Sequence, residues 1–295
     1  MKYLVTGGAG FIGSNLALEL EKQDNDVTVI DNFFSGHEDN LKKFKGKVLK
    51  KDISKPFEIK EKFDAIFHQA AITDPRHSND DELINQNISG FKNILTISQR
   101  HNSKLIYASS AAVYGNTGIP QKEEQEKELT NAYAKSKLII DEMASHHLDK
   151  MHIVGLRYFN VFGPNESHKG RPASMIYHLI KQIREKKDPK LFKMGEQKRD
   201  HIYVKDCVSA NILALDGKPG IYNVGTGKGT SFNDLLKIIN EALGTKTKPE
   251  YIDMPYDPKT YQNNTQAYTK KAESGLKFRA KYLLKNAIKE YAEMI

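Results

Sequence analysis

The sequence predicts an α/β fold in which a doubly wound parallel sheet is followed by a smaller C-terminal α/β lobe. In the first half, short runs of apolar and β-branched residues alternate with stretches of helical periodicity, the pattern of parallel strands joined by crossover helices. A glycine-rich turn, TGGAGFIG, stands directly between the first such run and the first helical stretch. After Pro164 the alternation loosens, and the 295 residues are enough for two lobes around a sizeable core.

The individual elements follow from their residues in chain order. Apolar, β-branched runs predict strands at 3–7, 27–31, 47–52, 64–70, 104–110 and 152–160, with crossover helices between them. The second half predicts strands at 201–204 and 220–225, helices near 172–186, 205–215, 231–243 and 281–294, and a Pro-, Tyr- and Asn-rich stretch at 253–268. We expect a dinucleotide-binding domain at 1–164, to which 200–225 returns, and a substrate-binding lobe formed mainly by 165–199 and 226–295.

Composition excludes several classes of protein. The net charge of +8 comes from 45 Lys and Arg residues scattered among 37 acids, which indicates solvated faces that attract a small anionic substrate, not a nucleic-acid site. The absence of a long apolar run, together with a first segment that predicts a strand and not a signal peptide, leads us to expect a cytoplasmic protein that does not bind membranes. The single cysteine, Cys207, cannot form an internal disulfide, and no Cys/His cluster predicts a metal.

The glycine-rich turn predicts a Rossmann-type dinucleotide site. Gly7, Gly10 and Gly13 permit a tight turn and a close approach of the backbone to a pyrophosphate at the helix N-terminus. Asp31 ends the second predicted strand, where its carboxylate can accept hydrogen bonds from the adenosine ribose. We expect NAD and not NADP, because this carboxylate would repel a 2′-phosphate. Asp52 and Ile53, at the end of the third strand, either flank the adenine or form a plain loop.

A tyrosine and a lysine one helical turn apart carry the chemical signal. Tyr133 and Lys137 share one face of a predicted helix, so that the ammonium is expected to lower the pKa of the phenol and allow proton exchange with a substrate hydroxyl. A serine on the strand YASSAAVYG is expected to hold the same oxygen, and we favour Ser110 over Ser109. The alternative is an ordinary exposed Tyr/Lys pair.

Taken together, the motifs resemble those of the extended short-chain dehydrogenase/reductases, specifically the nucleotide-sugar epimerases and dehydratases. The segments that carry the resemblance are TGGAGFIGSN, DN at 31–32, HQAA at 68–71, YASSAAVYG, YAKSK, LRYFNVFGP and KRDHIYVKD. It implies a tightly held nicotinamide cofactor, Ser110 and Tyr133 on the reacting oxygen, and Lys137 on the ribose. It also implies cofactor contacts at Phe11, Ile12, Asn32, Ala70, Ala71 and Asn87, and substrate contacts at Thr73, Asn160, His168, Arg199 and Tyr261. From the residues alone, Arg199 beside Asp200 predicts a surface ion pair.

The segment RYFNVFGPNESHKGRPASMIYHL is similar to one subgroup, the ADP-glycero-manno-heptose 6-epimerases. The resemblance implies that Lys169 is a second acid/base opposite Tyr133, which suits a reaction that removes hydride from one face of a carbon and returns it to the other. A solvated lysine or a phosphate anchor is the alternative. The chain departs from the subgroup at Arg171–Pro172 and in AITDPRHSNDDEL (71–83), two segments expected near the sugar.

The expected function is therefore NAD-dependent epimerisation of a nucleotide-diphosphate sugar through a keto intermediate, with ADP-glycero-manno-heptose 6-epimerase favoured. A UDP-hexose 4-epimerase is the main alternative, because Ser110 and Tyr133 would suffice for it. A sugar-nucleotide dehydratase is disfavoured by Ala111–Ala112, where those enzymes carry an Asp-Glu pair, and a non-catalytic NAD-binding protein by the presence of Ser, Tyr and Lys together. The resemblance also implies a homo-oligomer, formed through helices near 85–100 and 133–147 unless their apolar faces belong to the core.

Overall fold

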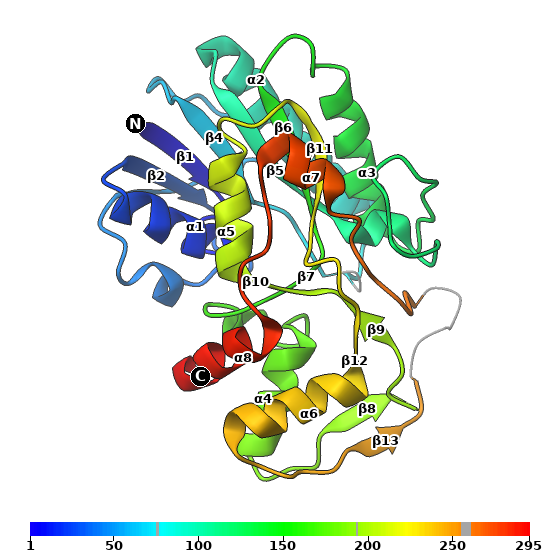
Figure 1. Cartoon of the computed structure of the whole chain (residues 1–295). Helices are drawn as coiled ribbons and strands as arrows, with labels where there is room; N and C mark the ends of the chain where they lie inside the picture. The colour runs from blue at the N-terminus through cyan, green and yellow to red at the C-terminus, as the bar shows by residue number, and fades with distance from the viewer. Residues whose placement is uncertain (75–76, 193, 255–260) are drawn as a thin grey trace.

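The computed structural model describes residues 1–74, 77–192, 194–254 and 261–295. Among these residues, a seven-stranded sheet has the order β11-β6-β5-β4-β1-β2-β3, and each neighbouring pair is parallel (Figure 1). The chain winds outward from β1 in one direction and then in the other, which confirms the expected doubly wound α/β fold. The strands are β1 (Lys2–Thr6), β2 (Asp26–Asp31), β3 (Lys47–Lys50), β4 (Ala65–His68), β5 (Lys104–Ser110), β6 (Ile153–Tyr158) and β11 (Gly220–Val224).

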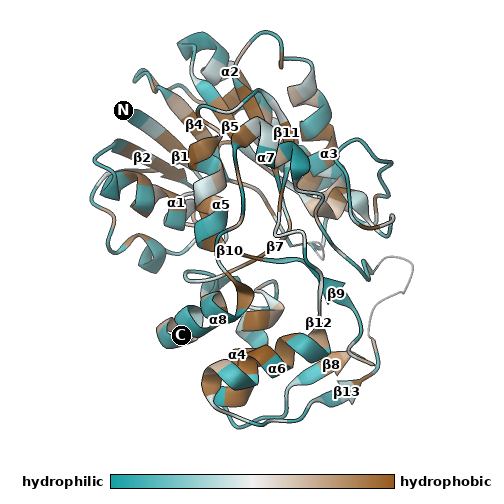
Figure 2. Ribbon diagram, in the orientation of Figure 1, coloured by the Kyte–Doolittle hydropathy of each residue, from teal (hydrophilic) through white to brown (hydrophobic). Residues whose placement is uncertain are grey.

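Helices cover both faces of this sheet. Helices α1 (Phe11–Lys22), α5 (Val204–Leu213) and α7 (Lys270–Leu276) bury one apolar cluster against it, and α2 (Asp80–His101) and α3 (Ala132–Ser145) bury another. Figure 2 shows the apolar residues concentrated in the strands between these layers. Because a parallel sheet covered on both faces excludes water, its strands are almost continuously apolar, and this explains why the sequence pattern is clear in this half.

Side-chain caps fix where the helices nearest the carboxyl edge of the sheet begin. Asn131 precedes α3, and its side-chain oxygen accepts a hydrogen bond of 2.8 Å from the backbone N–H of Ala134. Asn79 caps α2 in the same way, accepting from Glu82 at 3.0 Å. Such caps satisfy backbone donors that the helix itself leaves unpaired. Tyr133 therefore lies in the first, well-anchored turn of α3.

The expected strand at 152–160 is interrupted after Tyr158. The backbone N–H of Phe159 still donates to Val224 of the sheet, but that of Asn160 donates to Asp200 outside it. Strand β7 (Asn160–Phe162) then pairs in parallel with β10 (His201–Tyr203), so the strand expected at 201–204 forms away from the main sheet. These two short strands carry the chain from the sheet into the second body of the molecule (Figure 1).

The second body has its own apolar core, to which α4 (Met175–Arg184), α6 (Phe232–Leu243) and α8 (Leu284–Met294) contribute. Two further strand pairs border it: β8 (Lys190–Phe192) with β13 (Glu250–Ile252), and β9 (Lys198–Arg199) with β12 (Thr230–Ser231). Helix α7 and the β8–β13 pair were not predicted from the sequence. Part of the stretch expected at 253–268 lies outside the described residues. Within the described residues, no helix is long and apolar enough to cross a membrane.

Candidate active site

A cavity of about 410 Å³ opens at the carboxyl edge of the sheet, beside β1 and β4, where the strand order reverses direction. Doubly wound folds bind ligands at this position because the loops after the strands diverge there. Of the residues expected in the site, the following line the cavity: Gly7, Gly10, Phe11, Ile12, Gly13, Asp31, Asn32, Asp52, Ile53, Ala70, Ala71, Thr73, Asn87, Tyr133, Lys137, His168 and Lys169.

The glycine turn leaves no room for side chains. Gly7 has φ of +69°, and a Cβ there would lie 2.6 Å from the backbone of Ala70. A Cβ on Gly13 would clash with the carbonyl oxygen of Gly7. Helix α1 begins at Phe11 with Gly10 as its N-cap, so no side chain satisfies its first N–H groups. These groups face a cavity that can take an anionic phosphate, which fits the pyrophosphate of a dinucleotide.

We expect the Gly13→Ala protein to unfold at a lower temperature and to retain less bound NAD. The added methyl must push the turn apart, and overpacking of this kind costs about 1–3 kcal/mol. The measurements are thermal unfolding and NAD recovered per chain. Gly118→Ala is the matched control, because in the described part of the chain no atom lies within 4 Å of a Cβ at that position. Equal NAD content and stability in both variants would contradict the assignment.

Asp31 is held at the end of β2 by the same turn. Its carboxylate accepts hydrogen bonds from the backbone N–H of Ala9 at 2.9 Å and of Phe33 at 2.8 Å. Burial raises the pKa of this carboxyl, although these two hydrogen bonds oppose the change. A carboxylate has about four acceptor positions, so capacity remains for a ribose diol. The position and the chemistry fit the adenosine end of NAD.

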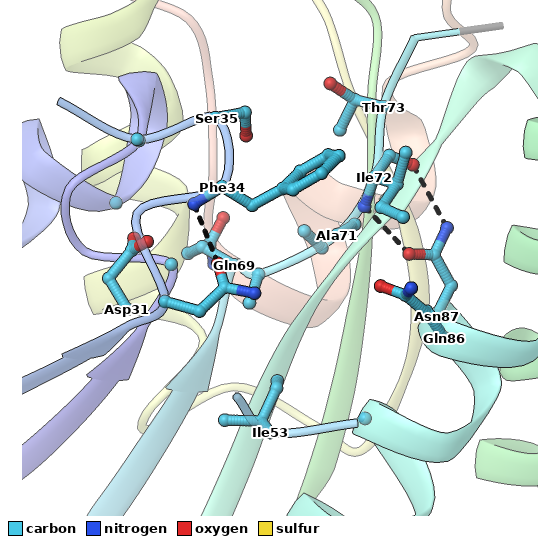
Figure 3. A pocket seen from close by; sticks show the side chains of 18 of the residues that line it. Asp31, Phe34, Ser35, Ile53, Gln69, Ala71, Ile72, Thr73, Gln86 and Asn87 are labelled. Carbon is cyan, nitrogen blue, oxygen red and sulfur yellow. Dashed lines mark hydrogen bonds between the residues drawn. The ribbon is translucent and has the colours of Figure 1, made fainter. Parts of the chain in front are cut away.

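The remaining walls come from the ends of neighbouring strands. Figure 3 shows Asp31 and Gln69 on one side, Asn87 on the other, and the ring of Phe34 reaching between them. The Asn87 side chain holds the segment after β4 through two hydrogen bonds: it accepts from the backbone N–H of Ile72 at 2.8 Å and donates to the Ile72 carbonyl at 3.1 Å. Asp52 accepts from the hydroxyl and backbone N–H of Ser54.

Several residues that line the cavity were not predicted as site residues from the sequence, among them Phe34, Ser35, Gln69, Ile72, His77 and Gln86. For Phe34 the sequence carries one signal, a large apolar residue in the polar loop three residues after Asp31, and the structure leaves its side chain 65% exposed. The others carry no local signal. They line the cavity only because β2 and β4 end at the same edge of the sheet.

Tyr133 and Lys137 both line the cavity, and the serine of β5 that lines it with them is Ser109, not the favoured Ser110. The Lys137 ammonium lies 5.8 Å from the centre of the Tyr133 ring and donates to the carbonyl of Ala108 at 2.7 Å. The Ser110 hydroxyl accepts from the backbone N–H of Ala112 at 3.1 Å, whereas the Ser109 hydroxyl donates to Asp141 at 2.9 Å. The two serines therefore point to different partners, as neighbours on a strand do.

The protonation of this group differs from the expectation. Burial raises the pKa of Tyr133, and the neighbouring Ser110 side chain offsets this only in part, so the expected lowering is wrong for the chain without cofactor. Burial also lowers the pKa of Lys137 to about 8. The reason is that desolvation penalises each charged form, and the amine is directed at Ala108 and not at the phenol.

Lys169 enters the same cavity from a short 3-10 helix, η3 (Ser167–Lys169). Its amine lies 5.6 Å from the centre of the Phe11 ring, and burial lowers its pKa against the opposing charges of Glu166 and Asp74. Buried Glu166 anchors this segment by accepting hydrogen bonds from the N–H of Gly163 and from the N–H and hydroxyl of Ser174. A lysine whose pKa is lowered in a cavity loses its proton more readily than a lysine in water, so it can exchange protons with a bound ligand.

His168, the neighbour of Lys169, lies toward the loop after the glycine turn. Its Nδ1 is 3.0 Å from the side-chain nitrogen of Asn40, which also donates to the carbonyl of Ala9 at 2.8 Å. Burial lowers the pKa of His168. The structure therefore ties the segment that carries Lys169 to the segment that holds Asp31.

Three expected substrate residues lie elsewhere, beside β9 and β12. Arg199 donates to the carbonyls of Lys198 and Asn263, and its guanidinium lies 5.1 Å from the centre of the Tyr261 ring. Asn160 donates to the hydroxyl of Thr265 at 2.8 Å. The adjacent Asp200 accepts from Thr226, Gly227 and Ala267, so the surface ion pair predicted for Arg199 and Asp200 from the sequence is replaced by two separate sets of partners.

A doubly wound sheet, a glycine turn with an acid after β2, and a Tyr/Lys pair at the cavity define a nicotinamide-dependent enzyme class. Residues 3–225 match the model of the NAD dependent epimerase/dehydratase family, and the chain belongs to this family. It is 37% identical to the ADP-L-glycero-D-manno-heptose-6-epimerase of Brachyspira hyodysenteriae, over 99% of this chain and 97% of that protein.

Solved structures agree with this. The Helicobacter pylori ADP-L-glycero-D-manno-heptose-6-epimerase superposes with a TM-score of 0.93 at 39% identity, covering 99% of this chain and 95% of that one. The Thermotoga maritima UDP-glucose 4-epimerase has a TM-score of 0.89 at 27% identity, covering 99% and 98%. These findings confirm the expected class, an NAD-dependent isomerase that epimerises nucleotide sugars.

Proposed function

We propose that the chain inverts C6 of an ADP-glycero-manno-heptose, with Tyr133 and Lys169 as a pair of acid/base groups. The observation that carries the proposal is that both side chains line the cavity that contains the glycine turn, although they come from different elements, α3 and η3. Inversion requires hydride to leave one face of a carbon and to return to the other. Two proton carriers from two walls suit such a reaction.

Each residue has a definite task in this reaction. Tyr133 takes the proton of the sugar hydroxyl that is oxidised, and Ser110 holds the same oxygen through its hydroxyl. Bound NAD supplies the hydride acceptor and donor. Lys137 holds the ribose and stabilises the phenolate when its amine is charged. After the keto sugar has turned its other face, Lys169 supplies the proton to the carbonyl oxygen as hydride returns.

The second body of the molecule is proposed to bind the nucleotide end of the substrate. Arg199 lies against the Tyr261 ring, and a guanidinium held in this way can bond a diphosphate through two N–H groups. Asn160 lies on β7 and pairs with His201 of β10, two residues after Arg199. We propose that it contacts the sugar or its phosphates. In this arrangement residues 1–164 bind NAD, and residues 165–199 and 226–295 mainly bind the substrate. The resemblance also supports a cytoplasmic homo-oligomer.

A UDP-hexose 4-epimerase is the second candidate, and the similarity to the Thermotoga maritima UDP-glucose 4-epimerase favours it. In that reaction one tyrosine can serve both directions while the keto intermediate rotates. Lys169 would then bind a phosphate and would not exchange protons. The heptose is preferred because the identity to the Helicobacter pylori heptose epimerase is 39%, against 27% for the glucose epimerase.

Purified enzyme incubated without added cofactor should convert ADP-glycero-manno-heptose to its C6 epimer, because the cofactor is oxidised and reduced within each turnover. The product is followed by NMR through the coupling of the proton on C6. UDP-glucose, in a parallel incubation, should remain unchanged. Conversion of UDP-glucose to UDP-galactose with no change in the heptose would replace this proposal by the second candidate.

A further inference from the structure

A buried aspartate lies beneath the Tyr133–Lys137 pair. Asp141 is on α3, four residues after Lys137 and eight after Tyr133, so the three side chains share one helical face. It is only 2% exposed. A carboxylate so far from water must have strong partners on the protein, because an isolated buried charge is costly.

Three neighbours from other elements are those partners. Asp141 Oδ1 accepts from the hydroxyl of Tyr107 at 2.9 Å, and Oδ2 accepts from the hydroxyl of Ser109 at 2.9 Å. The Nε of Arg157, on β6, donates to Oδ2 at 2.8 Å. Arg157 also donates to the hydroxyl of Tyr114 at 2.9 Å, which extends the network to η2 (Ala111–Tyr114).

The network reaches Lys137 through strand β5. Tyr107 and Ser109 both donate to Asp141, and the residue between them, Ala108, presents its carbonyl to the Lys137 amine at 2.7 Å. Alternate residues of a strand share a face, so the two hydrogen bonds that Asp141 accepts hold the strand on either side of the Ala108 carbonyl. Asp141 therefore acts on Lys137 by holding its acceptor and by its own charge.

We propose that Asp141 is a positioning residue that keeps Lys137 charged beside Tyr133 at working pH. The inference rests on the proposed roles of Lys137 and Tyr133. The charged or titratable groups around Asp141 are Lys137 and Tyr133 on α3, Arg157 on β6, Tyr107 on β5, Tyr114 on η2 and Lys127 in the segment between η2 and α3, and His68 on β4 lies near Lys137. Burial lowers the pKa of His68 to about 3, so this side chain is neutral and adds no compensating charge.

The sign of the effect follows from the charges. The Asp141 carboxylate raises the pKa of Lys137 and opposes the burial that brings it to about 8. In Asp141→Asn this support is lost, the pKa falls further, and the ammonium is lost at a lower pH. The alkaline limb of the kcat profile should move to lower pH by about 1 unit, within the range for a lost opposite charge.

The experiment measures kcat against pH for the complete enzyme on the nucleotide sugar that the wild type converts. A second readout avoids turnover: the enzyme as purified is labelled with acetic anhydride at several pH values, and Lys137 modification is measured by mass spectrometry. Lys137 of Asp141→Asn should become reactive at lower pH than in the wild type. An unchanged profile and unchanged labelling in an active, folded variant would overturn the proposal, whereas an inactive wild type would point instead to the wrong substrate.

Two further variants separate positioning from loss of structure. Asp206→Asn changes another buried aspartate, which accepts from the backbone N–H of Lys281 and Tyr282 far from Lys137, and should leave both pH dependences unchanged. If Asp141→Asn fails to fold because Arg157 is left unpaired, the double variant Asp141→Asn/Arg157→Gln removes both charges. It should fold and still label Lys137 at lower pH. Wild-type labelling in the double variant would also overturn the proposal.

Discussion

Tyr133→Phe is expected to lower turnover by about 100- to 10,000-fold, the usual contribution of a positioned proton-transfer group. Tyr133 lines the cavity that contains the glycine turn, and the change removes only its phenolic oxygen. Because Tyr133 follows the Asn131 cap in the first turn of α3, the helix and the glycine turn should be unaffected. The measurement is kcat by NMR on the preferred sugar nucleotide, with bound NAD quantified in the same preparation.

Tyr251→Phe is the matched control for this prediction. Tyr251 is a partly exposed residue of β13 whose hydroxyl bonds to Asn233 in the second body. Its variant should keep both turnover and NAD. A Tyr133→Phe enzyme with near-normal turnover would remove Tyr133 from the mechanism, and one that had lost NAD would indicate a cofactor-binding role instead.

Lys169→Met is expected to lose turnover on the heptose about as severely as Tyr133→Phe. In a two-base inversion each face of the carbonyl needs its own proton carrier, so loss of either Tyr133 or Lys169 stops the reaction cycle. Methionine keeps an apolar side chain of similar length against the Phe11 ring, over which the amine now lies. The measurement is kcat and KM for ADP-heptose, with Lys181→Met, on the exposed side of α4, as the control.

The alternative role of Lys169 gives a different kinetic result. If Lys169 only binds a phosphate, its loss should weaken substrate binding by about 1.5–3 kcal/mol, the range for a hydrogen bond to a charged group. KM would then rise while kcat stayed nearly unchanged. This outcome on the best substrate would contradict the two-base mechanism and favour the hexose.

The glycine turn and the Tyr133/Lys137 pair could be predicted because each depends on residues that are close together in the sequence. Gly7, Gly10 and Gly13 lie within one strand–turn–helix unit, whose geometry depends on a few neighbouring backbone angles. Tyr133 and Lys137 are one helical turn apart, so any helix there brings them to one face. The alternating strands and helices likewise predicted the parallel sheet, because its two covered faces require continuous apolar runs.

Contacts between distant segments decided the remaining features of the site. Ser109 and Ser110 are adjacent and chemically identical, yet only Ser109 lines the cavity and donates to Asp141, whereas the Ser110 hydroxyl accepts from the backbone N–H of Ala112. The pKa of Tyr133 is raised and not lowered, since its burial is set by the surrounding elements and not by its spacing from Lys137. Sequence spacing fixes geometry over one helical turn, whereas burial and partners depend on which remote strands and loops pack together.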